Sequence, residues 1–430
     1  MKNKLIVISV DALVFEDIEY LKTKPNFKFI IENGSMVERI HSIYPSLTYP
    51  CHTTMATGCY PDKHEVVNNY CFELKKAPSW MFGHENVKCE DILDRCKLAG
   101  LTTASVSWPV SGNHRSADYL VNECWPEKIW DENNFEDVLI KNGTSKCLFD
   151  EIVKKHLPMR ILRRHPQTAY FSTNVAADII RKHTPDILTL HIANIDHYRH
   201  KSGVFSDLVT KGLNEVDDML SILMDATKEA GVFEKTNFVI TSDHGQINKT
   251  RHINLNCLFA TNGLIETNAE GEITDWTAWC NSSGMSAQIY LKNPNDEKIH
   301  NAVYNLLKEK CEEGLWGISA VYTREEFKKM HLDGKFSFMV ETDGYTAFKN
   351  DWKVPVVNLP LADCGCVGAE HGFHPDKGPR PPFIAYGPDI LKGVVLPEAE
   401  LVDGAPTYAK IMGIELPYAD GKPLTKLLKM

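Results

Sequence analysis

The sequence predicts an α/β protein built on a mostly parallel sheet. Short runs rich in β-branched residues alternate with longer segments whose apolar residues recur at helical spacing. The runs that we expect to be buried strands are KLIVISV, TTASVSW, DILTLHI, TNFVITS and SAQIYLK. Between them lie segments such as DLVTKGLNEVDDMLSILMDATKEAG, which we expect to form a helix that ends at Gly231. This alternation is typical of proteins in which helices connect parallel strands.

The chain is long enough for one large domain with a subdomain. It has 430 residues, of which 43% are hydrophobic and 24% charged. The pattern changes from about Cys257 to about Val354, where DEKIHNAVYNLLKEKCEEG predicts a helix and SAVYT and FSFMVE predict strands. We therefore expect a main domain of residues 1–256 and 355–430, with a small inserted α/β cap at 257–354.

The formal net charge of −10 argues against a protein that binds nucleic-acid backbones. Such binding needs a basic face, so we expect no stable nucleic-acid complex. Any phosphate chemistry would then depend on bound cations.

The first residues, MKNKLIVISVDAL, combine a basic start with an apolar run. Asp11 interrupts the run before it reaches the length of a signal peptide, so we interpret it as the first buried strand. No other apolar stretch is long enough to span a bilayer, and we expect a cytoplasmic protein that does not bind membranes. The 12 cysteines suit free thiols in a reducing compartment, and we expect Cys364 and Cys366 to be buried structural thiols.

Acidic residues and histidines follow several of the predicted strands. Open α/β sheets bind ligands at the carboxyl ends of their strands, so these side chains predict one polar cluster at one edge of the sheet. Carboxylates and imidazoles together are the ligands of zinc, manganese and iron centres. The candidate ligands are Asp11, Asp196, His200, Asp243, His244 and His371.

The stretch IYPSLTYPCHTTMATGCYPDKHEVVNN supplies a candidate nucleophile. Pro50 suits the first turn of a helix that runs to Gly58, and Thr48 would lie just before it as an N-cap. A threonine hydroxyl is a poor nucleophile at neutral pH. A bound divalent cation allows it to lose its proton and attack phosphorus, and a capping role is compatible with catalysis.

Other histidines have simpler interpretations. His191 falls within a buried strand and is expected to be a hydrogen-bonded core residue, whereas His197 is an alternative to His200 as a ligand. We expect His52 and His64 to support the helix and the turn that follows it.

The motifs VDAL, YPSLTYPCHTTMATGCYPDKHEVVNN, D-x-x-x-H-x-x-G, SDHG and HGFH occur in this order along the chain. The set resembles the nucleotide pyrophosphatase/phosphodiesterase branch of the alkaline phosphatase superfamily, from Val10 to the segment VDGAPTYAKIMGIELP. The resemblance implies an alkaline-phosphatase-like fold and two divalent metal ions, with zinc favoured over manganese or iron. It implies one ion on Asp196, His200 and His371, and another on Asp11, Asp243, His244 and Thr48.

The same resemblance implies a two-step hydrolysis. Thr48 attacks to form a covalent phospho-threonine, and water then releases a phosphate monoester. Asn69 aligns with the asparagine that holds a non-bridging phosphate oxygen. Because a neutral amide suits the single charge of a diester, whereas monoesterases usually use arginine, we expect a small phosphodiester or nucleotide substrate. Tyr70 and Trp108, with Phe72 and Trp80, are candidate walls of the substrate pocket.

Two alternatives stay open. One is a phosphomonoesterase or phosphonate hydrolase of the same superfamily, which needs an additional cationic group, and the other is a non-catalytic metal-binding relative. The chain also departs from the family at two positions. Cys51 stands where many members have asparagine, and Glu65 stands where glycine is usual. We expect Glu65 to add negative charge near the pocket and to disfavour polyanions. The sequence does not indicate an oligomeric state.

Overall fold

The computed structural model describes residues 3–72, 74, 79–125, 135–160, 164–359 and 368–429. Its centre is an eight-stranded sheet with the strand order β19-β2-β18-β6-β1-β5-β3-β4. The strands are β1 (Lys4–Val10), β2 (Ser35–His41), β3 (Thr103–Val106), β4 (Tyr119–Val121), β5 (Ile187–Ile192), β6 (Thr236–Thr241), β18 (Phe383–Tyr386) and β19 (Val395–Glu400).

The sheet is mostly parallel, as the sequence predicts. β1 lies between β5 and β6 and pairs with both in parallel, and the pairs β3–β5, β3–β4 and β19–β2 are parallel too. β18 runs antiparallel to both of its neighbours, β2 and β6. Every residue of β5 and β6 is buried, as expected for strands covered on both faces.

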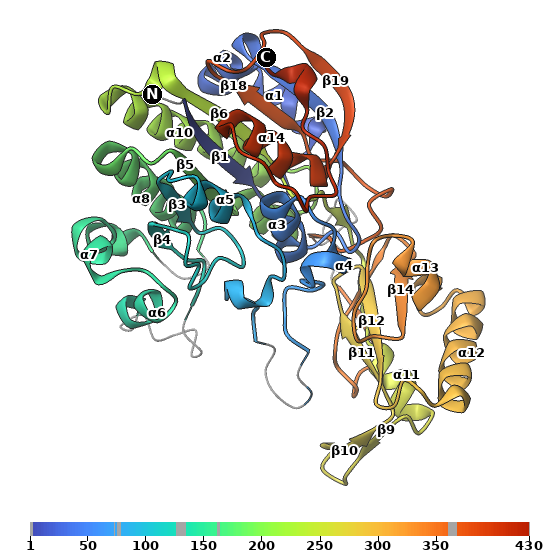
Figure 1. The fold of residues 1–430 in the computed structure, drawn as a ribbon. Coiled ribbons are helices and arrows are strands. Elements are labelled where there is room, and N and C mark those ends of the chain that lie inside the picture. Colours follow the sequence, from blue (N-terminus) through green and yellow to red (C-terminus); the bar gives the residue numbers. More distant parts are fainter. Residues whose placement is uncertain are drawn as a thin grey trace.

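Helices cover both faces of the sheet (Figure 1). On one face α2, α8 and α10 form a core with Ile6, Ile8 and Val10 of β1. On the other face α3, α5 and α14 pack over Leu5 and Val7. The alternation of side chains along β1 therefore feeds two separate cores. These helices are α2 (Pro25–Asn33), α3 (Thr48–Thr57), α5 (Ile92–Leu98), α8 (Gln167–His183), α10 (Asp207–Glu229) and α14 (Gly404–Met412).

A second, smaller lobe projects from this body (Figure 1). It holds an antiparallel sheet with the order β11-β12-β14-β13, against which α12 (Glu297–Glu313) packs. SAQIYLK is a strand, as predicted, but it lies in this second sheet. The strands are β11 (Ala278–Ser282), β12 (Ser286–Leu291), β13 (Ile318–Thr323) and β14 (Phe338–Thr342).

A three-stranded sheet connects the lobe to the body. β8 (Arg251–Ile253) pairs with β15 (Thr346–Phe348) and with β16 (Val356–Asn358). The sheet therefore combines β8 and β16, from the predicted main domain, with β15, from the predicted cap. The cap boundaries at residues 257 and 354 stay a prediction.

The other α-helices and strands of the described chain are short. They are α1 (Ile18–Leu21), α4 (Pro61–His64), α6 (Phe135–Lys141), α7 (Lys146–Leu148), α9 (Asn194–Ser202), α11 (Leu255–Thr261), α13 (Arg324–Lys328), β7 (Ile247–Asn248), β9 (Ile265–Thr267), β10 (Ile273–Trp276) and β17 (Ala369–Glu370).

The structure bears on the expected absence of membrane-spanning helices and on the expected free thiols. Among the described helices, none has the length and apolar character needed to cross a membrane. All cysteines in the described ranges are free thiols. Cys364 and Cys366 lie outside the described residues.

Candidate metal and phosphate site

Three neighbouring strands bring the candidate ligands to one edge of the sheet. Asp11 directly follows β1, Asp243 and His244 follow β6, and α9, which carries Asp196 and His200, follows β5. The Nε2 atom of His244 lies 3.6 Å from Oδ1 of Asp11 and 3.2 Å from Oδ2 of Asp243. These three residues form one cluster, which we call the second group.

Asp196, His200 and His371 form an adjoining cluster, the first group. Oδ1 of Asp196 is 3.2 Å from Nε2 of His200 and 3.8 Å from Nε2 of His371. Nδ1 of His200 lies 2.9 Å from the carbonyl of Ala369, and Nδ1 of His371 lies 3.3 Å from that of Ser46. With each Nδ1–H donated to a carbonyl, Nε2 of each ring faces the Asp196 carboxylate and is the nitrogen available to a cation.

The backbone around His371 requires glycine. Gly372 has φ = 90°, and a Cβ atom there would lie 1.8 Å from the carbonyl oxygen of Ser283. The close approach holds the loop that carries His371 against the second lobe.

The donor atoms of the second group suit a divalent cation. Oδ1 of Asp11 and Oδ2 of Asp243 are buried and have no hydrogen-bond partner. Burial, and then the carboxylates of Asp243 and Asp196, raise the pKa of Asp11 well above its usual value. Burial also lowers the pKa of His244 to about 4, so this imidazole is neutral, as a metal ligand must be. A cation would satisfy both carboxylates.

The first group fits a cation in the same way. Burial lowers the pKa of His371 to about 3. For His200 burial also acts downwards, but Asp196 and Glu370 outweigh it and raise the pKa to about 9. The surroundings of His200 therefore favour a positive charge, and a divalent cation would compete with its proton.

Thr48 lies against the second group. It is the first residue of α3, and the N-cap is Leu47, so the expectation that Thr48 is the N-cap is wrong. Its Oγ1 lies 3.3 Å from Nε2 of His244. His52 supports this end of the helix as predicted, with Nδ1 at 2.8 Å from the Thr48 carbonyl and Nε2 at 2.8 Å from Ser9 Oγ on β1. α3 ends at Thr57, and Gly58 is its C-cap, as expected of the residue that stops the helix.

The other histidines have supporting positions. His64 lies 3.0 Å from Thr54 Oγ1 of α3, which agrees with its predicted role. His191 is buried with Nε2 at 3.0 Å from Oδ2 of Asp11, so it orients a candidate ligand. His197 packs against His165 with ring centroids 4.9 Å apart and is not part of the first group.

A cavity of about 500 Å³ is lined by all three residues of the first group and by Thr48, which contacts His244 of the second group. Thr48, Asn69, Tyr70 and His371 are among the residues that line it. Oδ1 of Asn69 accepts the N–H of Tyr49 at 2.9 Å. This bond turns the Nδ2 donor of Asn69 away from the helix, so it can donate to a phosphate oxygen beside Thr48.

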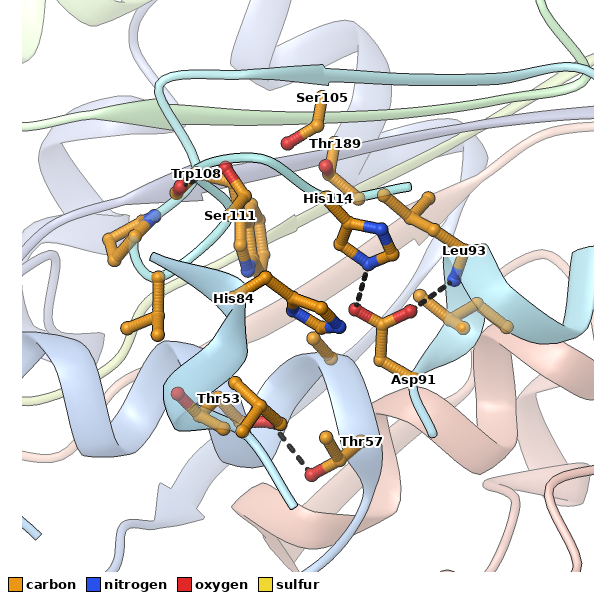
Figure 2. Close-up of a pocket in the computed structure, with 15 residues that line it drawn as sticks. Thr53, Thr57, His84, Asp91, Leu93, Ser105, Trp108, Ser111, His114 and Thr189 are labelled. Carbon is orange, nitrogen blue, oxygen red and sulfur yellow. Dashed lines mark hydrogen bonds and ion pairs between the residues drawn. The ribbon is translucent and has the colours of Figure 1, made fainter. Parts of the chain in front are cut away.

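The aromatic candidates separate into two sets. Tyr70 and Trp80 line the cavity, with ring centroids 4.4 Å apart. Phe72 instead stacks on Tyr290 at 3.9 Å. Trp108 is 4% exposed and packs edge-on against His52. It lines a different, small pocket, together with Thr53 and Thr57 of α3 (Figure 2). The structure therefore does not bring Trp108 to the cavity at Thr48. Trp108 is part of the core instead of the cavity wall, and the sequence pattern did not indicate its burial.

His84, Asp91 and His114 line that small pocket (Figure 2), and with Asp94 they form another cluster of histidines and aspartates. Oδ1 of Asp91 caps α5 by accepting the N–H groups of Leu93 and Asp94. Nε2 of His114 lies 2.8 Å from Oδ2 of Asp91, and Nδ1 of His114 accepts the N–H of Ser116. Both ring nitrogens of His114 are thus used in holding the chain to α5, and the cluster has a structural explanation.

Sequence reasoning missed several polar residues around the first group. Gln246 donates to the Asp196 carboxylate, and buried Glu370 lies with Oε1 at 3.6 Å from Nδ1 of His200. Nζ of Lys249 lies 2.9 Å from Oε2 of Glu370, and Lys349 also lines the cavity. The position of Glu370 directly before His371 is the one sequence signal that could have identified it.

Glu65 does not line the cavity. It is the exposed C-cap residue of α4, with φ = 62°, so the expectation that its charge lies near the pocket is not supported. The left-handed backbone conformation explains why glycine would suit this position.

We expect Glu65→Gly to be more stable than Glu65→Ala by about 0.5–1 kcal/mol, since alanine keeps the backbone strain and glycine removes it. Urea denaturation of the two variants measures the difference. Equal stabilities would show that the left-handed conformation carries no cost here.

Comparisons with known proteins assign the chain to a family. The fold is that of the alkaline-phosphatase-like α/β proteins. The chain belongs to the family described as type I phosphodiesterase / nucleotide pyrophosphatase, which matches residues 5–373. This confirms the resemblance that the motifs indicated.

Among the curated relatives, family member 3 of the ectonucleotide pyrophosphatases/phosphodiesterases from Rattus norvegicus is 22% identical over 429 residues, covering 93% of this chain and 41% of the relative. Family member 1 from Homo sapiens is 26% identical over 237 residues, covering 53% and 22%. The chain thus spans less than half the length of these relatives.

The solved structures show the same fold. Murine ectonucleotide pyrophosphatase/phosphodiesterase 5 superposes with a TM-score of 0.68 at 18% identity, covering 99% of this chain and 100% of that one. An inactive form of the murine protein in complex with AMP gives a TM-score of 0.67.

Proposed function

We propose that this protein is a metal-dependent phosphodiester and nucleotide pyrophosphate hydrolase that acts through a phospho-threonine. The observation that carries the proposal is the position of Thr48. Its hydroxyl lies 3.3 Å from a second-group imidazole, and Thr48 lines the cavity together with the three residues of the first group. Membership of the phosphodiesterase / nucleotide pyrophosphatase family supports the same conclusion.

The residues define which atoms take part. Asp196, His200 and His371 would hold one cation, and Asp11, Asp243, His244 and Thr48 the other. Such cations lower the pKa of the hydroxyl and stabilise the attacking and leaving oxygens. Carboxylate and imidazole donors suit zinc, with manganese and iron as alternatives.

The reaction has two displacements at phosphorus. In the first, Thr48 Oγ1 loses its proton to solvent and forms a bond to phosphorus, and the leaving group departs with the electrons of its P–O bond. In the second, a water oxygen bonds to phosphorus and gives up a proton to solvent, and Thr48 Oγ1 departs with the electrons of its P–O bond and takes a proton from solvent. One water is consumed, and a phosphate monoester is released. Asn69 Nδ2 donates to a non-bridging oxygen throughout.

The cavity favours a diester over a monoester. Among the described residues that line it none is arginine, and the donor next to Thr48 is the neutral amide of Asn69. Tyr70 and Trp80 offer aromatic surface for a flat base. AMP is bound in a solved relative, which supports a nucleotide as one part of the substrate.

The test is the ratio of kcat/KM for bis(p-nitrophenyl) phosphate to that for p-nitrophenyl phosphate, measured after reconstitution with zinc or manganese. We expect a ratio well above one, because one neutral donor next to Thr48 holds a singly charged phosphate better than a dianion. A ratio below one would contradict the diesterase assignment and favour monoester chemistry, with Lys349 as the cationic group.

A further inference from the structure

Lys349 brings a positive charge to the cavity from the second lobe. It directly follows β15 and lines the cavity together with Thr48 and Asn69. Its backbone N–H donates to the Ile253 carbonyl at 3.0 Å, and that of Phe348 donates to Gly284 at 2.8 Å. The chain beneath this lysine is therefore fixed, while its side chain is 44% exposed.

The charge of Lys349 is not neutralised by its acidic neighbour. In the described part of the chain, that neighbour is Glu370, with Oε2 at 3.6 Å from the ammonium group. The same Oε2 lies 2.9 Å from buried Lys249, and the other carboxylate oxygen lies 3.6 Å from His200. One carboxylate thus faces three basic side chains, and Lys349 is the most exposed of them.

Lys349 lies beside the first group, whereas the nucleophile lies beside the second. Thr48 contacts His244 of the second group, whereas Glu370, the neighbour of Lys349, contacts His200 of the first group. In an in-line displacement the leaving oxygen departs away from the attacking one. The leaving group is therefore directed towards the first group and the lysine beside it.

We propose that Lys349 binds a phosphate carried by the leaving group, and so selects pyrophosphates over diesters whose leaving group is an uncharged alcohol. This inference rests on the proposed function. An ammonium ion acts as a point charge on a phosphate without needing a fixed geometry, which suits a flexible polyphosphate. Two or more linked phosphates, as in a nucleoside triphosphate, provide the matching charge.

The experiment compares Lys349→Met with the wild-type protein on two substrates, in the presence of zinc or manganese. ATP has pyrophosphate as a leaving group, and the p-nitrophenyl ester of thymidine monophosphate has p-nitrophenolate. We expect kcat/KM for ATP to fall by about 10- to 100-fold, and that for the ester to change by less than about threefold.

Lys292→Met is the matched control. Lys292 is an exposed lysine of the same lobe that pairs with Asp275 outside the cavity. We expect it to leave both substrates unaffected. An equal loss for both substrates in Lys349→Met, or no loss for either, would overturn the role of Lys349.

A binding measurement gives a readout that does not depend on turnover. In a Thr48→Ala background, calorimetry with α,β-methylene-ATP and with AMP should show that Lys349→Met weakens only the methylene analogue, by about 10-fold or more. Equal affinities of the analogue with and without Lys349 would contradict the inference. Inactivity of the wild-type protein on both substrates would instead contradict the proposed function.

Discussion

Thr48→Ala is expected to lower kcat/KM for bis(p-nitrophenyl) phosphate by about 10³-fold or more, because it removes the hydroxyl that forms the covalent bond to phosphorus. The fold should be unaffected. Among the described residues, the side-chain partner of the Thr48 hydroxyl is His244, and alanine is acceptable in the first turn of α3. We expect the free energy of unfolding to change by less than about 1 kcal/mol.

Thr53→Ala is the matched control for this experiment. Thr53 is buried in the same helix, and its hydroxyl donates to the Tyr49 carbonyl at 2.8 Å, away from the site. We expect it to keep activity within about threefold of the wild-type protein. The metal content of both variants should be measured as well. Thr48→Ala protein that retains metal and more than a tenth of the activity would contradict the mechanism.

The main sheet and the ligand positions could be predicted because both depend on local patterns. β1 runs from Lys4 to Val10 as the apolar run KLIVISV predicts. Asp11 and Asp243 follow adjacent parallel strands, and parallel strands end at the same edge. The chemistry of that edge was therefore present in the order of motifs before any contact was known.

The walls of the cavity could not be predicted in this way, because they depend on contacts between distant segments. Trp108 and Trp80 have similar sequence settings, yet one is in the core and the other lines the cavity. Lys349 reaches the cavity through the pairing of β15 with β8, which are about a hundred residues apart in the chain. No periodicity within either segment indicates that pairing.

The strongest test of the second group combines metal removal with Asp11→Asn. In the metal-free protein the raised pKa of Asp11 means that its ionised form destabilises the fold. Because the folded pKa lies above the unfolded value, the folded state binds more protons, and stability falls as pH rises from the unfolded pKa towards the folded one. Asparagine has no such charge, so metal-free Asp11→Asn should be more stable than the wild-type protein at pH 8, with a shallower pH dependence.

Adding zinc or manganese should reverse the order of the two proteins. A ligand that binds only the folded state raises its stability, by about 2.7 kcal/mol at a hundred times Kd, and the wild-type protein should gain this in full. Asp11→Asn should gain much less, because the second group has lost an anionic ligand. Thermal unfolding with and without metal, at several pH values, measures both effects.

Asp17→Asn is the control. It shows whether the metal-dependent change in stability is specific to Asp11 or follows from the loss of any buried carboxylate. Burial also raises the pKa of Asp17, but replacing Asp17 leaves the fully buried Arg199 without its carboxylate partner, so the protein should lose about 3 kcal/mol whether or not metal is present. If Asp11→Asn gained as much stability from metal as the wild-type protein does, Asp11 would not be a ligand. The opposite signs expected for Asp11→Asn without and with metal follow from a single cause, a buried carboxylate placed to bind a cation at a cost in stability when that cation is removed.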